Sequence, residues 1–365
     1  MLTLIIFILI LSALVMSHEF GHFIVAKRAG MRVDEFGFGF PPRIFGWKRG
    51  ETLYSINLIP FGGFVKIYGE DGDEGGVDKD KKFTSKRKMD QGAVILAGVV
   101  FNFILAWALF SAGFMIGFPV AADSATTGTL RDEKVIITHI LPSSPAERAG
   151  LILGDSVQSL SYGNEEIIPL RGDEVSDFIR KIPRGESVEL TYMRGDAVTD
   201  VTLIPEDTIA EENRVIGIGM DVIGFLELPA HKALYEGGKR TVTMTALVVE
   251  SLYELLKKTV DGEASLESVS GPIGIYMIVG EAHMLGLSYL ISLTALLSVT
   301  LGVMNLIPFP ALDGGRFLFL LIEALKGSPI KPKIANAINF VGFAALILLM
   351  LVISYGDLAK FGFFS

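Results

Sequence analysis

The sequence predicts a polytopic α-helical membrane protein with four transmembrane helices, a membrane-associated β-rich region and one inserted α/β domain. Half of the 365 residues are hydrophobic, and the mean hydropathy is +0.49. Such values are typical of a chain with several membrane spans and not of a soluble domain with one anchor. Four charge-free runs are each close to or above the roughly 20 residues that cross a bilayer as a helix: 1–17, 91–122, 284–312 and 334–356.

The N-terminal membrane part is expected over residues 1–124. Its first helix, 1–26, reaches span length only by continuing beyond the charge-free run through two histidines. Because it lacks a basic start and a small-residue cleavage site, we expect a retained span and not a signal peptide. A β-rich loop over 32–68, with a turn at Pro60-Phe61-Gly62-Gly63, is apolar enough to dip into the membrane or to cover a site. The charged, Gly-rich stretch 69–82 is interpreted as a linker, and the second helix is expected over 91–117.

The rest of the chain divides into a soluble domain and a second membrane part. Residues 125–222 alternate short strands with two helical pieces, at 144–150 and 172–182. Residues 223–365 begin with a helical pattern over 231–260, which carries too many charges to span comfortably and is predicted to lie at the membrane interface. Two further spans, 287–312 and 334–356, complete the predicted fold.

The charge distribution predicts the orientation. Residues 23–90 carry 13 Lys or Arg, whereas the much longer segment 117–287 carries 14, together with 27 Asp or Glu. The denser basic loop should be cytoplasmic. The first and third spans then run in the same direction, and both chain ends and the domain 125–222 lie outside.

Residues 18–22 read His-Glu-Phe-Gly-His. Histidines four residues apart share one face of a helix, and each offers a neutral imidazole nitrogen to zinc. The glutamate between them cannot be a third ligand, but it can act on a water molecule at such an ion. From this chain's own His and Glu content, H-E-x-x-H is expected by chance roughly 0.004 times, so coincidence is a poor explanation. The chain has no cysteine, which leaves histidine and carboxylate as ligand types.

Asp313 is the second part of the candidate site. Followed by two glycines, an aspartate is often only a helix cap. Here the orientation places it at the inner end of the third span, at the same depth as His18 and His22. Two prolines just before it, in Asn305-Leu306-Ile307-Pro308-Phe309-Pro310, break the helix and free backbone carbonyls, which a membrane tolerates only beside protein or water. A water-using site has this requirement, and polar residues in a span are costly without a function.

These motifs together resemble the site-2 protease family of zinc intramembrane proteases (peptidase family M50B), in its bacterial regulator-of-sigma-E branch. The matching pieces follow the family's order over nearly the whole chain: His18–His22, the Pro60–Gly63 region, Gly98–Asn102, a PDZ-like signature at 144–155, Gly271-Pro272-Ile273-Gly274 and Asn305–Gly315. Two departures concern substrate gating. The chain shows one PDZ-like domain where the best-known members have two, and Val99 follows Gly98 where relatives often have proline.

The resemblance implies a set of site residues. His18, His22 and Asp313 would bind one Zn²⁺ per chain, and Glu19 would be the catalytic residue. Asn305 and Asn102 would contact substrate. The alternatives that the residues leave open are a hydrogen bond from the side-chain amide of Asn102 to a neighbouring helix and a cap of the broken helix by Asn305.

The predicted function is therefore that of a zinc-dependent intramembrane endopeptidase in regulated intramembrane proteolysis, acting near the cytoplasmic face of the bacterial inner membrane. Its expected partners are the lipid bilayer, transmembrane substrates of the anti-sigma factor or remnant signal peptide type, and an upstream site-1 type protease; no nucleic acid is expected. The PDZ-like domain either filters or recruits substrate. A metal transporter and a catalytically silent PDZ scaffold are the rival functions, which the single metal cluster and the intact Glu19 disfavour.

Overall fold

A computed structural model describes residues 1–70, 78–122, 130–141, 143–195, 197–207, 214–262 and 270–360. The chain forms two compact units. The first consists of Met1–Phe110, Gly237–Val279 and Leu293–Ser365, and the second of Ser111–Glu236 and Gly280–Ser292.

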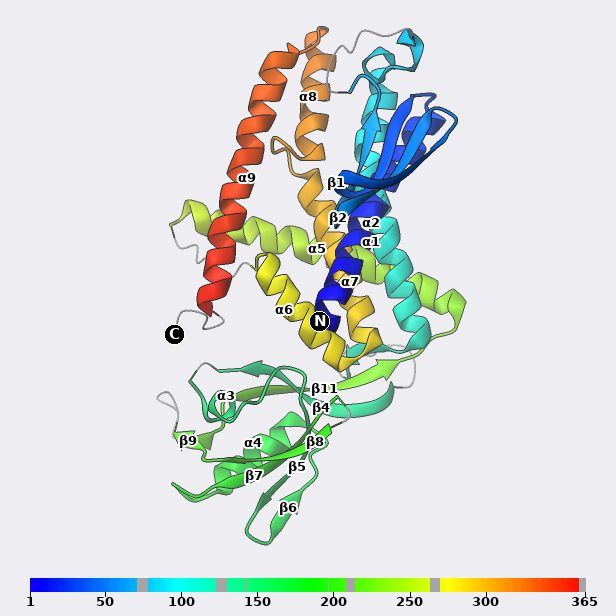
Figure 1. The fold of residues 1–365 in the computed structure, drawn as a ribbon. Coiled ribbons are helices and arrows are strands. Elements are labelled where there is room, and N and C mark those ends of the chain that lie inside the picture. Colours follow the sequence, from blue (N-terminus) through cyan, green and yellow to red (C-terminus); the bar gives the residue numbers. More distant parts are fainter. Residues whose placement is uncertain are drawn as a thin grey trace. The chain divides into compact units, whose positions relative to one another are not determined.

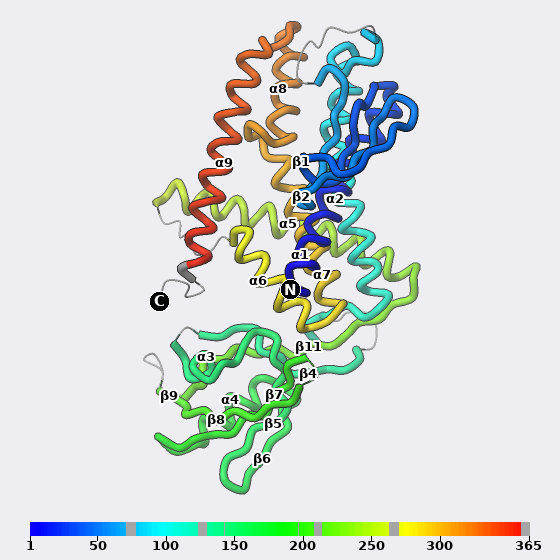
Figure 2. Tube along the Cα trace, viewed as in Figure 1, coloured from blue at the N-terminus to red at the C-terminus, as the bar shows by residue number. Residues whose placement is uncertain are grey.

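Four helices of the described chain are long and apolar enough to cross a membrane. They are α1 (Leu2–Arg28), α2 (Lys88–Ile116), α7 (Leu287–Leu306) and α9 (Pro332–Lys360). In Figure 1, α1 and α7 run in one direction and α2 and α9 in the other, while α5 (Ala230–Val260) runs across them. The Cα trace in Figure 2 shows the start of α1 and the last turns of α9 at the same end of the first unit. These helices correspond to the predicted spans and to the predicted helix 231–260.

The third predicted helix, 287–312, is too long, because α7 ends at Leu306. Residues 307–312 form a loop, and Asp313 begins a separate helix, α8 (Asp313–Lys326), that the sequence reading did not predict. A Cβ atom on Gly314 or on Gly315 would lie 2.2 Å from a carbonyl oxygen of this loop, so the two glycines let the loop pack onto the first turn of α8. The prolines therefore end one helix and do not merely kink it.

A further unpredicted helix, α6 (Pro272–Leu285), begins within the motif Gly271-Pro272-Ile273-Gly274. Pro272 suits the first turn of a helix, where its missing N–H costs nothing. The buried carboxylate of Asp357 on α9 caps this end, since Oδ2 accepts hydrogen bonds from the backbone N–H groups of Gly271 and Gly274, each at 2.9 Å.

The β-rich loop forms two long strands, β1 (Val33–Arg49) and β2 (Thr52–Ile67). The central segment 35–38 lies opposite 53–56 on one side and 63–66 on the other, and 45–49 also lies opposite 52–56. The predicted turn at Pro60–Gly63 is thus a bend inside β2, with Gly62 at φ 90°. Of the predicted linker 69–82, residues 71–77 lie outside the described ranges, and two short 3-10 turns, η1 (Lys79–Lys81) and η2 (Phe83–Ser85), lead into α2.

Buried apolar side chains hold the elements of the site together. Ala26 of α1, Val33 of β1, Ile67 of β2, Val94 of α2 and Leu320 of α8 belong to one hydrophobic cluster. The end of α1, the sheet, the first turns of α2 and the middle of α8 are therefore one packed body.

The second unit contains a seven-stranded sheet in the order β3-β11-β4-β5-β7-β8, with β6 paired to β5. Its strands are β3 (Phe118–Ala121), β4 (Leu130–Ile140), β5 (Ser156–Tyr162), β6 (Glu165–Ile167), β7 (Val188–Arg194), β8 (Ala197–Leu203) and β11 (Ile218–Leu226). The remaining elements are α3 (Pro145–Arg148), α4 (Gly172–Lys181), and the short pair β9 (Glu206–Asp207) and β10 (Arg214–Val215). The sheet thus extends beyond the predicted limits 125–222 at both ends.

Candidate active site

Three side chains from two distant parts of the chain meet in the first unit. His18 and His22 lie one turn apart on α1, and Asp313 is the first residue of α8. Nε2 of His18 and Nε2 of His22 are 3.1 Å apart, and they lie 3.0 and 3.2 Å from Oδ2 of Asp313. The structure therefore brings together the three predicted metal ligands.

This geometry fits a metal ion. Zinc–nitrogen and zinc–oxygen bonds of about 2.0–2.1 Å place the ligand atoms of a tetrahedral site roughly 3.3 Å apart. The separations of 3.0–3.2 Å are close to that value, and Oδ2 of Asp313 is buried without a hydrogen-bond donor among the described residues. Three acceptor atoms that face one point in a buried site repel one another unless a cation lies between them.

The backbone of α2 orients His22. Its Nδ1 lies 2.8 Å from the carbonyl oxygen of Val94, which can only accept a hydrogen bond. The proton of a neutral His22 is therefore on Nδ1, and Nε2 presents its lone pair to the centre of the triad.

His18 and His22 also depend on a glycine and an amide of α2. A Cβ atom on Gly98 would lie 2.4 Å from Nε2 of His22 and 2.6 Å from Cε1 of His18, so both rings occupy space that only glycine leaves free. One turn later, Nδ2 of Asn102 lies 3.2 Å from Nδ1 of His18. Asn102 has no exposed surface, and its Oδ1 lacks a hydrogen-bond partner among the described residues.

A cavity of about 190 Å³ adjoins the triad. Glu19 lines it beside the two histidines and Asp313, and the strand β2 contributes Phe64, Val65 and Ile67. Arg316, one turn after Asp313 on α8, donates a 2.6 Å hydrogen bond to Glu70 at the edge of the cavity. Asn305 is half-buried in the last turn of α7 and is not part of this lining.

Sequence reasoning missed three features of the site. The carbonyl of Val94 carries no side-chain signal, and only the spacing 94, 98 and 102 on one helix face points to it. Gly98 was noted as a family feature without its steric role. Arg316 follows Asp313 at helical spacing, but its partner Glu70 lies 246 residues away in the chain.

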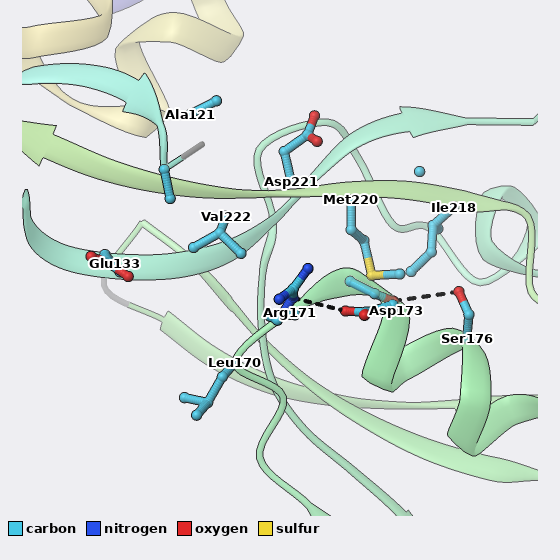
Figure 3. Close-up of a pocket in the computed structure, with 13 residues that line it drawn as sticks. Ala121, Glu133, Leu170, Arg171, Asp173, Ser176, Ile218, Met220, Asp221 and Val222 are labelled. Atoms are coloured by element: carbon cyan, nitrogen blue, oxygen red, sulfur yellow. Dashed lines mark hydrogen bonds and ion pairs between the residues drawn. The ribbon is translucent and has the colours of Figure 1, made fainter. Parts of the chain in front are cut away.

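The second unit has an open groove of about 680 Å³ between β11 and α4. Figure 3 shows Met220 of β11 directed towards α4, where Arg171 forms an ion pair with Asp173 at 3.3 Å. β3 pairs only with 223–226 of β11, so within the described residues the segment 218–222 keeps a strand edge along the groove. Such an edge suits the addition of an extended peptide.

Comparisons with known proteins cover almost the whole chain. The model of peptidase family M50 matches residues 6–349. Proteins named zinc metalloprotease RasP from Oceanobacillus iheyensis and Shouchella clausii are 30% and 32% identical to the chain, over 99% and 98% of it and 99% of each relative. The regulator of sigma-W protease RasP of Bacillus subtilis is 30% identical over 98% of both chains.

Among solved structures, a PDZ domain of the SdrC-like protein from Listeria monocytogenes matches 25% of the chain and 92% of its own length, with 18% identity and a TM-score of 0.22. The family model covers both α1 with its H-E-x-x-H motif and α8 with Asp313. The chain therefore belongs to peptidase family M50 and is a metalloendopeptidase.

Proposed function

We propose that the chain is a zinc-dependent intramembrane endopeptidase that cuts transmembrane segments of other membrane proteins near the cytoplasmic face. The observation that carries this proposal is the buried triad of His18, His22 and Asp313, whose facing atoms are separated by 3.0–3.2 Å. These atoms would hold one Zn²⁺ per chain, and a set of three protein ligands is the number found in catalytic zinc sites. When bound, zinc supplies Lewis-acid chemistry that lowers the pKa of water towards ~7.

Glu19 is proposed as the general base. It lines the same cavity as the triad, and its position between the two histidines on α1 keeps its carboxylate near the reacting centre. The carboxylate takes a proton from the attacking water and passes it to the nitrogen of the leaving amine.

The strand β2 is proposed to hold the substrate in an extended form. A transmembrane helix hides its scissile carbonyl in i to i−4 hydrogen bonds and must unwind before it is cut. Residues 63–66 of β2 pair with β1 on one side only in the described register, and Gly63 lies against α1 beside Met16 and Glu19. An unwound segment that pairs with the other edge of 63–66 would pass Glu19.

The membrane orientation supports cleavage near the cytoplasmic face. The basic bias of residues 23–90 favours a cytoplasmic position of this loop, with both chain ends and the PDZ-like domain outside the bacterial inner membrane. The common direction of α1 and α7 in Figure 1 agrees with that orientation. Helix α5 is proposed to lie at the interface, where charges on one face remain in water.

The substrates are proposed to be membrane proteins of the anti-sigma factor or remnant signal peptide type. One relative is named regulator of sigma-W protease, which supports the first type. An upstream site-1 type protease would remove the external part of such a substrate, and the PDZ-like domain would admit only the trimmed form.

Co-expression with candidate membrane substrates tests the proposal. The intact chain should cut a trimmed substrate, whereas Glu19→Gln should lose at least about 100-fold in rate while retaining zinc and fold. Near-normal cleavage by Glu19→Gln would assign the base to another residue. An intact chain that never cuts but moves metal across vesicles would support a transporter, and one that does neither would support a silent scaffold.

A further inference from the structure

Three successive turns of α2 face the two histidines of α1. The carbonyl of Val94 lies against His22, Gly98 leaves room for both rings, and the amide of Asn102 lies against His18. Val94 and Gly98 each have a clear structural role, whereas the role of Asn102 depends on which end of its amide faces His18.

The position of the proton on His18 decides which end of the Asn102 amide can form a hydrogen bond with it. Nε2 of His18 faces the triad, so binding a metal there requires a lone pair on Nε2 and places the proton of the neutral ring on Nδ1. A protonated Nδ1 needs an acceptor. The neighbouring amide offers both ends, since Oδ1 accepts and Nδ2 donates, and a half-turn of the amide exchanges them.

We propose that Asn102 is a positioning residue of the metal site: with metal bound, its Oδ1 accepts a hydrogen bond from Nδ1–H of His18 and so directs Nε2 to the metal. This inference rests on the proposed zinc site. The amide atom nearer to His18 in the structure is Nδ2, 3.2 Å from Nδ1, and a half-turn of the amide puts Oδ1 in its place. An amide can present either a donor or an acceptor to His18, whereas a carboxylate in the same place can only accept.

Burial separates this role from contact with a substrate. Asn102 has no exposed surface and does not line the cavity beside Glu19. Ser298 of α7 donates a 2.7 Å hydrogen bond to the backbone carbonyl of Asn102, a contact that does not involve the amide side chain. A partner that hydrogen-bonds the second nitrogen of a ligating histidine typically changes metal affinity by about 10–100-fold.

The proposal is tested by the zinc affinity of the full-length protein in detergent, measured by competition with chelators of known zinc affinity. Asn102→Leu keeps the side-chain size but has no acceptor, and it should bind zinc about 10–100-fold more weakly. Asn102→Asp can only accept, and it should bind zinc at least as tightly as the wild type. Ser298→Ala is the matched control, because it removes the neighbouring hydrogen bond but keeps the amide and should leave zinc affinity unchanged.

Two further measurements separate positioning from a structural role. Without metal, the variants Asn102→Leu and Asn102→Asp should unfold at similar temperatures. The visible spectrum of the Co²⁺-loaded protein should differ from that of the wild type in Asn102→Leu and should match it in Asn102→Asp. Equal zinc affinity of Asn102→Leu and wild type would overturn the proposal, as would a weakening in Asp as large as in Leu. If Asn102→Leu does not fold, weaker zinc binding by Asn102→Asp than by the wild type is sufficient to overturn the proposal. A wild-type protein that binds no zinc would instead reject the proposed function.

Discussion

A methyl group on Gly98 is the smallest change that tests the arrangement of the proposed metal ligands. It would lie 2.4 Å from Nε2 of His22 and 2.6 Å from Cε1 of His18. Non-bonded heavy atoms are comfortable at about 3.5 Å, so one or both rings must move by about 1 Å. Zinc–ligand distances tolerate only about 0.2 Å. We therefore expect Gly98→Ala to weaken zinc binding at least about 100-fold, which is the upper end for loss of one supporting hydrogen bond.

Metal content by mass spectrometry and zinc affinity by chelator competition measure this effect. Overpacking between helices should cost a further 1–3 kcal/mol, approximately, in the free energy of unfolding. Gly356→Ala on α9 is the matched control, since a Cβ atom there meets nothing within 4 Å. If Gly98→Ala kept wild-type zinc affinity and activity while Gly356→Ala behaved normally, the two rings would not bind metal in the positions described.

Three other predictions address the fold, the orientation and the groove. Asp357→Ala should lower the free energy of unfolding by about 1.5–3 kcal/mol, seen as a lower melting temperature, because it uncaps α6 at Gly271; an unchanged value would refute the cap. In intact cells a membrane-impermeant thiol reagent should label Ser176→Cys but not Ser85→Cys, both exposed positions, and the reverse pattern would overturn the orientation. Ser176→Trp would fill the groove between β11 and α4, whereas Asp177→Trp, outside the lining, is its control. If the groove recruits substrate, only Ser176→Trp should slow cleavage of a trimmed substrate. If neither variant has an effect, the PDZ-like domain acts as a filter.

The four long apolar helices were predictable because a helix that crosses a membrane must be long and apolar whatever its neighbours are. The first helix, the second and the last differ from the prediction by a few residues at their ends. The predicted end of the third helix was wrong because Gly314 and Gly315, which have no Cβ atom, leave room for the loop carbonyls of Ile307 and Phe309. No helical periodicity reveals this contact. Helix α6 was missed for a similar reason, since its cap, Asp357, lies 86 residues after Gly271.

The sequence by itself determined which chemistry the chain carries. Two histidines at helical spacing with a glutamate between them, and an aspartate after a broken helix, point to the proposed ligands and the proposed base, because side-chain chemistry and helix geometry are local. Only the tertiary structure decided how these groups are held. The carbonyl of Val94 and the space beside Gly98 position the histidines across the contact between α1 and α2. Neither can be predicted from side-chain types, because one is a backbone group and the other is the absence of a side chain.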